Sequence, residues 1–269
     1  MHRKGIYLSL LILSTLPGYS FAANSGHFGY ADMTPAAKKA IDKYIQDYGR
    51  TVEKLLVSLG EEKARTIAGR LDVAMKEEYM LEYKKAYDTD KEIYQKYPDS
   101  TLLLLQMAAI SYKRAHVRNG DWLHSYKESI GYSEKCLKID TNNGGCWFLY
   151  GVALGEYITS VGIFKTIAHI KEVNDAFENA ARYTRDTLPF GPRGLNSRTA
   201  AYMGLTQFYR VCPDWWIMKL IAGIRGDKKR PTSIQKKSLP LISTGPTPGP
   251  MPLYVMALWK KMKKSSRKG

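Results

Sequence analysis

Residues that could carry out chemistry are few in this sequence, and their spacing matches no catalytic or metal-binding pattern. The chain has five histidines and three cysteines but no H-E-x-x-H, G-x-S-x-G or C-x-x-C motif. His116 and His124 lie eight residues apart, but the sequence Asn119-Gly120-Asp121 between them predicts a turn. A zinc site also needs further ligands. We therefore expect no enzyme activity, no catalytic residue, and no metal or cofactor.

Two of the cysteines lie close together in the sequence. Cys136 and Cys146 flank a predicted turn at Thr141 to Gly145, so a disulfide between them is one expectation if the protein enters an oxidising compartment. The alternative is that Cys136 is a small buried apolar residue with a free thiol. Both stay open, because a bridge also requires Cα atoms within about 7 Å of each other.

The N-terminal segment has the features of a secretory signal peptide. Arg3 and Lys4 precede an apolar run from Ile6 to Leu16, and small residues around Ala22 form a cleavage site. The alternative, a membrane anchor, is disfavoured because the run is about half of the roughly 20 residues that span a bilayer. We expect residues 1–22 to be removed and the mature protein to be periplasmic or secreted and soluble. The first cysteine is Cys136, so no lipid anchor is expected after the signal peptide.

Positive charge is concentrated near the C-terminus. The formal charge of the chain is +16, and residues 225–269 hold twelve lysines and arginines against Asp227 alone, a net charge of +11. Such a cluster on a nearly neutral, exported body argues against nucleic-acid binding. The basic tail at residues 260–269 follows the apolar stretch Leu253 to Trp259 and could contact anionic lipid or an acidic partner. The alternative is a solvated tail. The residues concerned are Lys260, Lys261, Lys263 and Lys264.

Hydrophobic periodicity predicts an all-α protein. Thr34 is a candidate N-cap with Pro35 at the first helical position, and apolar residues follow at spacings of three and four. A second long helix is expected from Glu61 to Tyr97, where Pro98 would end it. We expect residues 23–97 to form two N-terminal helices that pack on the rest of the chain.

Residues 98–259 resemble a tetratricopeptide array of about four divergent helix pairs. One near-complete repeat has its first helix at Trp147-x2-Tyr150-Gly151-x2-Leu154 and its second at Val173-x3-Phe177-x2-Ala180. Related first-helix cores contain the small residues Ala108, Gly204 and Ala257. Gly151 would let two helices approach closely, while Trp147 and Phe177 fill the volume beside it. The predicted repeat core is Trp147, Gly151, Phe177, Ala180 and Gly204.

Several motifs together resemble two families of divergent tetratricopeptide-like proteins. They are Tyr97-Pro98-Asp99, Glu134-Lys135-Cys136-Leu137, Gly151-x3-Gly155, Gly162-Ile163, the helix from Lys171 to Ala180, and the segment from Trp215 to Gly226. The families are the regulator of microtubule dynamics proteins and the T-component (TatT) proteins of tripartite periplasmic (TRAP) transporters. The signal peptide favours the second. That resemblance implies a non-catalytic helical module that works beside a solute-binding protein, usually as a lipoprotein, although this chain lacks the lipid-carrying cysteine.

A helical array presents its first helices on a concave face, which is where we expect binding. By repeat position, this face would include Tyr112, Phe148, Val152, Arg198, Phe208 and Tyr209. Such a face suits an apolar ligand, a peptide or a partner helix, with Arg198 available to a carboxylate. The alternative is that the N-terminal helices cover these residues as core.

The sequence thus favours a binding protein, an adaptor or accessory of a solute-uptake or envelope complex. Its partner would be a protein of the cell envelope, such as a solute-binding protein. The alternatives are a carrier of an apolar small ligand and a peripheral membrane protein that uses the basic tail. The sequence does not indicate the oligomeric state.

Overall fold

The computed structural model describes residues 33–117, 120–183 and 197–211, and every regular element in these ranges is helical. This confirms the predicted all-α class. The signal peptide and the basic tail lie outside the described residues. None of the helices in the described ranges is both long and apolar enough to cross a membrane. The elements are α2 (Pro35–Leu55), η2 (Val57–Leu59), α3 (Glu61–Tyr79), α4 (Tyr83–Lys96), α5 (Thr101–His116), α6 (Trp122–Ile139), α7 (Gly144–Val161), α8 (Ile163–Arg182) and α9 (Ser197–Val211).

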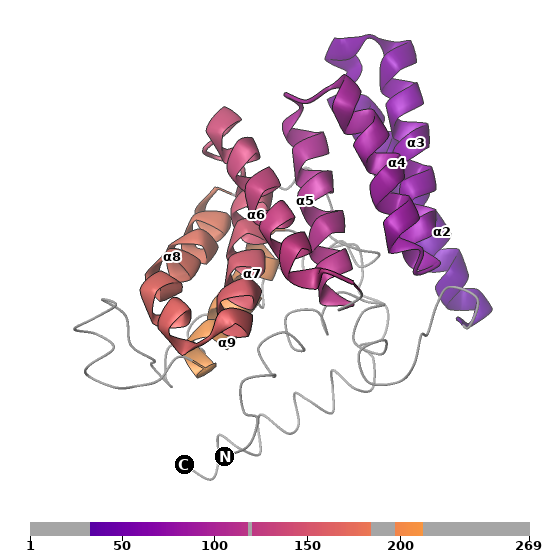
Figure 1. Ribbon diagram of the computed structural model, residues 1–269. Helices are drawn as coiled ribbons and strands as arrows, with labels where there is room; N and C mark the ends of the chain where they lie inside the picture. The colour runs from indigo at the N-terminus through magenta and orange to yellow at the C-terminus, as the bar shows by residue number, and fades with distance from the viewer. Residues whose placement is uncertain (1–32, 118–119, 184–196, 212–269) are drawn as a thin grey trace.

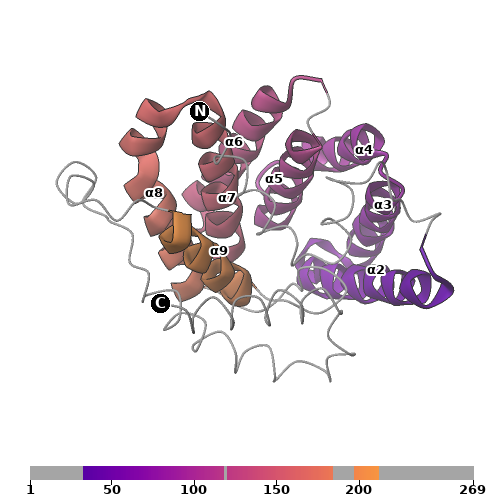
Figure 2. The same cartoon turned by 90° about the horizontal axis from the view of Figure 1, so that it is seen from below.

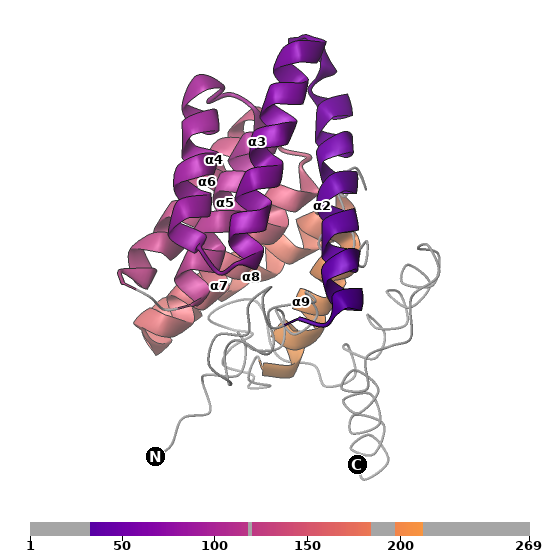
Figure 3. The ribbon, with the colours of Figure 1, turned by 90° about the vertical axis from the view of Figure 1, so that its right-hand side faces the viewer.

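The helices form an array in which each packs on the next along the chain (Figure 1). Helix α7 also contacts α5 and α9, so these three lie in one layer with α6 and α8 against them. Seen from below, the helices follow an arc from α2 and α3 at one end to α8 and α9 at the other (Figure 2). Figure 3 shows α2 and α3 as a pair joined at one end by η2. Of the four predicted pairs, the structure describes α5–α6, α7–α8 and the single helix α9.

Side-chain caps fix where several helices begin. The predicted N-cap is confirmed, since Thr34 Oγ1 accepts a hydrogen bond of 3.3 Å from the amide of Ala37. Helices α5, α6 and α7 begin in the same way, with side chains that satisfy an amide nitrogen of the first turn. These N-caps are Ser100, Asp121 and Asn143.

The expected single helix from Glu61 to Tyr97 is wrong, because the chain turns back after Tyr79. Leu81 adopts a positive φ of 66°, and the amide of Glu82 donates to the carbonyl of Glu77 at 2.9 Å to close the turn. A left-handed leucine costs about 1 to 2 kcal/mol, and the packing of α4 on both α3 and α5 offsets it. Between Met33 and Tyr97 the structure therefore has three α-helices, where the sequence predicted two.

Three of the five predicted repeat-core residues meet where Gly151 and Gly204 lie against the ring of Phe177, and a fourth, Ala180, lies in the same cluster. A Cβ added to Gly204 would lie 2.6 Å from the ring of Phe177, and one added to Gly151 would lie 3.4 Å from it. Ala180, one turn further along α8, is fully buried in the same cluster. Trp147 lies at the edge, half-buried, and its indole nitrogen donates to the carbonyl of Thr141 at 2.8 Å. The tetratricopeptide assignment itself stays a prediction.

A second, separate core joins α2 and α3 to α4 and α5. Its buried residues include Val52, Leu71, Ile93 and Leu103, one from each helix. A buried polar network runs beside it and also connects the four helices. The N-terminal helices therefore pack on one end of the array and form a core of their own there.

The close contact between Gly204 and Phe177 predicts that an added methyl group at position 204 destabilises the array. We expect Gly204→Ala to lower the free energy of unfolding by about 1 to 3 kcal/mol, because the new Cβ clashes with Phe177. Urea denaturation followed by circular dichroism measures the effect. Gly69→Ala is the matched control: Gly69 is also inside a helix but has open space around it, so alanine should raise stability by about 0.5 to 1 kcal/mol. Equal effects at the two sites would contradict this packing.

Candidate functional site

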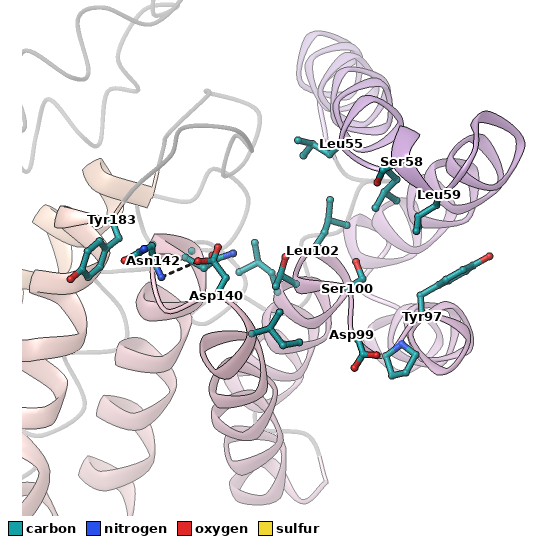
Figure 4. Close-up of a pocket in the computed structure, with 18 of the residues that line it drawn as sticks. Leu55, Ser58, Leu59, Tyr97, Asp99, Ser100, Leu102, Asp140, Asn142 and Tyr183 are labelled. Carbon is teal, nitrogen blue, oxygen red and sulfur yellow. Dashed lines mark hydrogen bonds between the residues drawn. The ribbon is translucent and has the colours of Figure 1, made fainter.

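A groove of about 760 Å³ lies along the edge of the array where several inter-helix turns meet, the upper edge in Figure 1. Its walls come from the end of α2 and η2, the α4–α5 turn, the α6–α7 turn and the end of α8 (Figure 4). We call it the turn groove. Its lining residues are Leu55, Leu56, Ser58, Leu59, Lys96, Tyr97, Pro98, Asp99, Ser100, Thr101, Leu102, Leu105, Ile139, Asp140, Asn142, Asn143, Gly144, Gly145 and Tyr183.

Large apolar side chains are exposed in this groove. Leu55 and Leu59 on one wall are 43% and 38% exposed, and Ile139 on another is 51% exposed. Single exposed apolar residues are ordinary on protein surfaces, but several gathered in one concavity mark a binding surface. Leu55 and Ile139 are more than 80 residues apart in the sequence, so only the fold brings them to the same cavity.

The polar groups of the groove belong to its turns. Ser100 and Asn143 are already engaged as N-caps of α5 and α7. Asp140 accepts a hydrogen bond of 3.0 Å from the amide of Asn142, drawn in Figure 4. Asp99 adds a negative charge to the lining of the groove, and Lys96 adds a positive one. This mixture of apolar walls and a polar rim suits recognition of an amphipathic segment.

The α6–α7 turn that forms one wall is closed by a disulfide between Cys136 and Cys146, whose Cα atoms are 6.3 Å apart. The structure thus contains the bridge, one of the two alternatives that the sequence left open. On the inner side, Gly145 lets α7 begin close to α5, since an added Cβ would lie 3.1 Å from the side chain of Leu105. The turn is therefore fixed both covalently and by packing.

The residues predicted to line a concave binding face belong to the core instead. Tyr112, Phe148, Val152, Phe208 and Tyr209 are each at least nine-tenths buried, all within the cluster built by α5 to α9. Of the two alternatives, an open face and a covered core, these positions belong to a covered core. The physical reason is that α7 packs against α5, α6, α8 and α9, which leaves little of its surface uncovered.

Direct contacts show which elements provide this cover. The rings of Phe148 and Phe177 pack together with their centroids 6.2 Å apart, and the hydroxyl of Tyr209 donates a hydrogen bond of 2.6 Å to Asn174 Oδ1. Both partners are on α8. The N-terminal helices, which the alternative interpretation placed here, form their own core with α4 and α5. Burial also raises the pKa of Tyr112 well above its ordinary value, so this phenol stays neutral.

Arg198, predicted to meet a ligand carboxylate, is half-buried in the first turn of α9. Its Nε is buried and has no hydrogen-bond partner within the described ranges. The space left near Val152 and Phe208 is only about 10 Å³. That volume holds about one water molecule. This space beside Val152 and Phe208 is too small for an apolar ligand.

The histidines take part in surface interactions. Nδ1 of His169 lies 2.8 Å from Glu172, which also accepts a hydrogen bond from the hydroxyl of Tyr150. His124 lies 3.8 Å from Glu128. Within residues 33–117, 120–183 and 197–211, no group of three or more histidines, cysteines and carboxylates could hold a metal ion.

None of the family models, curated proteins or solved structures compared with this chain matches it. The resemblance to tetratricopeptide-like T-component proteins therefore stays a prediction. Sequence reasoning missed the turn groove, although two of its turns contained signals. Pro98 predicts the end of a helix and residues Thr141 to Gly145 predict a turn, but the sequence does not show that the two lie at the same edge.

The disulfide predicts that reduction weakens the α6–α7 hairpin. Closing a loop of this length should contribute about 2 to 3 kcal/mol to the free energy of unfolding. Urea denaturation with and without dithiothreitol should show a lower midpoint for the reduced protein. The double variant Cys136→Ala/Cys146→Ala is the control and should not respond to the reductant. Free thiols at both positions in the untreated protein would contradict the bridge.

Proposed function

We propose that this protein is a non-catalytic, exported, tetratricopeptide-like binding protein that acts as an adaptor or accessory of a solute-uptake or envelope complex. The observation that carries the proposal is the turn groove, with its exposed Leu55, Leu59 and Ile139. A helical array with such a groove binds a segment of another protein through apolar anchors and polar turn residues.

The size of the groove supports a peptide segment as its ligand. A cavity of about 760 Å³ lies within the range of about 300 to 1,000 Å³ typical of ligand sites. Because two pairs of packed helices and a disulfide fix its walls, little ordering of the protein is needed on binding. Preorganisation of this kind favours affinity.

The disulfide also supports export, since such bonds persist in oxidising compartments and are rare in the cytosol. This agrees with the predicted signal peptide and with a partner in the cell envelope. A solute-binding protein is the partner that the family resemblance suggests.

The two alternative functions have less support. A small-ligand carrier would need an apolar cavity on the predicted concave face, and the space beside Val152 and Phe208 there has room for about one water molecule. Membrane binding through Lys260, Lys261, Lys263 and Lys264 depends on residues outside the described ranges and stays a prediction.

Two matched substitutions test the groove. Ile139→Lys places a charge among its apolar walls, whereas Met80→Lys places one at a similarly exposed helix end that does not line the groove. A lysine suits the C-terminal end of a helix, so neither change should disturb the fold. In affinity capture from envelope extract of the source organism, we expect the Ile139→Lys variant to capture about one-tenth as much partner as the unmodified protein. Met80→Lys should match the unmodified protein.

Equal capture by both variants would contradict binding in the turn groove. If the unmodified protein enriches no envelope protein over a column without bait, the adaptor function itself is contradicted. Each variant should first give the circular dichroism spectrum and elution volume of the unmodified protein.

A further inference from the structure

We infer that the seam between the N-terminal helices and the array is a proton-dependent latch, in which a protonated Asp90 keeps α2 and α3 docked on α4 and α5. The seam consists of the buried polar residues Tyr48 on α2, Glu77 and Glu78 on α3, Thr89 and Asp90 on α4, and Gln106 on α5. Because α2 and η2 carry Leu55 and Leu59, the latch also holds one wall of the turn groove.

Side-chain hydrogen bonds connect all four helices through Gln106. Its carbonyl accepts from the hydroxyl of Tyr48 at 3.1 Å, which ties α2 to α5. Its amide nitrogen lies 3.3 Å from Asp90 Oδ2 and 3.5 Å from Glu78 Oε1, and donates to both. Thr89 adds a hydrogen bond of 2.9 Å to Glu77. Separation of α2 and α3 from the array would break several of these bonds together.

The charges of the seam are matched only if one carboxyl group holds a proton. Glu77 forms an ion pair with Lys85, whose Nζ lies 3.2 Å from Glu77 Oε1, and Glu78 forms an ion pair with Lys113. Asp90 is 1% exposed and has no ion pair among the described contacts; its Oδ1 has no hydrogen-bond partner there. A buried anion beside Glu78 would be strongly unfavourable, whereas a neutral carboxyl group is tolerated.

Titration of the seam follows from this geometry. Burial, and next the charge of Glu78, raise the pKa of Asp90 well above its ordinary 3.8, while Gln106 and Lys113 oppose the shift and Glu77 adds to it. Burial also raises the pKa of Asp72, whose carboxylate lies against Gly49 of α2, and nearby Lys76 opposes that shift. Tyr48 stays neutral, because burial raises its pKa too.

The direction of the effect is a loss of docking as the pH rises. The docked state binds the Asp90 proton more tightly than an opened state, in which the pKa returns to about 3.8. From that pH up to the docked-state pKa, the equilibrium constant for opening rises by up to about tenfold per pH unit. Above the docked-state pKa it becomes constant.

Hydrogen exchange on the full chain at pH 5, 6, 7 and 8, corrected for intrinsic exchange, tests the latch. We expect protection of α2, η2 and α3 to fall with rising pH by several-fold more than that of α7 and α8 in the same molecule. Asp90→Asn, which mimics the protonated acid, should remove this difference. Asp88→Asn is the control, because Asp88 is an exposed residue of the same helix paired with Lys84 at 2.8 Å. If Asp90→Asn does not fold, Asp90→Leu removes the same titration.

A uniform pH response across all helices, or a response retained when Asp90 cannot titrate, would overturn the latch. The effect on partner capture rests on the proposed function and is measured separately. If exchange follows the pH but capture of the partner does not, the link between the latch and the groove is overturned. The proton-dependent docking of α2 and α3 would then still stand.

Discussion

The ring of Phe177 on α8 lies against two glycines, Gly151 on α7 and Gly204 on α9, and the array depends on this contact. A Cβ at Gly204 would lie 2.6 Å from the ring, too close for α9 to keep its place, and one at Gly151 would lie in tight contact, 3.2 Å from Ala176. The approach draws α7, α8 and α9 together, and α7 is also covered by α5 and α6. A central helix covered on so many sides stabilises the fold through apolar burial. Most of α7 is therefore buried, apart from its C-terminal end.

Because the faces of the helices are used for packing, the ends of the helices are available for binding. The α4–α5 and α6–α7 turns meet at one edge, and the end of α2 brings Leu55 and Leu59 beside them. Turn residues can vary without disturbing the core, so a groove at this edge combines a fixed frame with adaptable contacts. The cap residues Ser100 and Asn143 keep these turns in place while other polar groups face the groove.

Features within one helix or between sequence neighbours could be predicted from the sequence. The all-α class, the cap at Thr34, and the core positions Gly151, Phe177 and Gly204 all depend on spacings of at most a few turns or on repeat pattern. The cysteine pair across one turn left a bridge and a free thiol as alternatives. The break at Leu81 could not, because no glycine or proline marks it and only the packing of α4 offsets its left-handed backbone. Repeat position placed Phe148 and Phe208 on first helices, but it could not show that α8 covers them. The turn groove depends on contacts between segments more than 80 residues apart, such as Leu55 and Ile139.

Different interactions stabilise the two walls of the turn groove, one covalent and the other non-covalent. The walls therefore differ in how readily they can move. The α6–α7 wall contains a disulfide, so an oxidising compartment fixes it permanently. The opposite wall, at the end of α2, is tied to the array through the hydrogen bond that Gln106 accepts from Tyr48 of α2 and the one that it donates to Glu78 of α3. Hydrogen bonds to buried carboxyl groups open and close without a reagent, whereas the disulfide opens only when a reductant is present. If one wall moves relative to the other, it should therefore be the N-terminal one, and the exposed Leu55 and Leu59 would move with it.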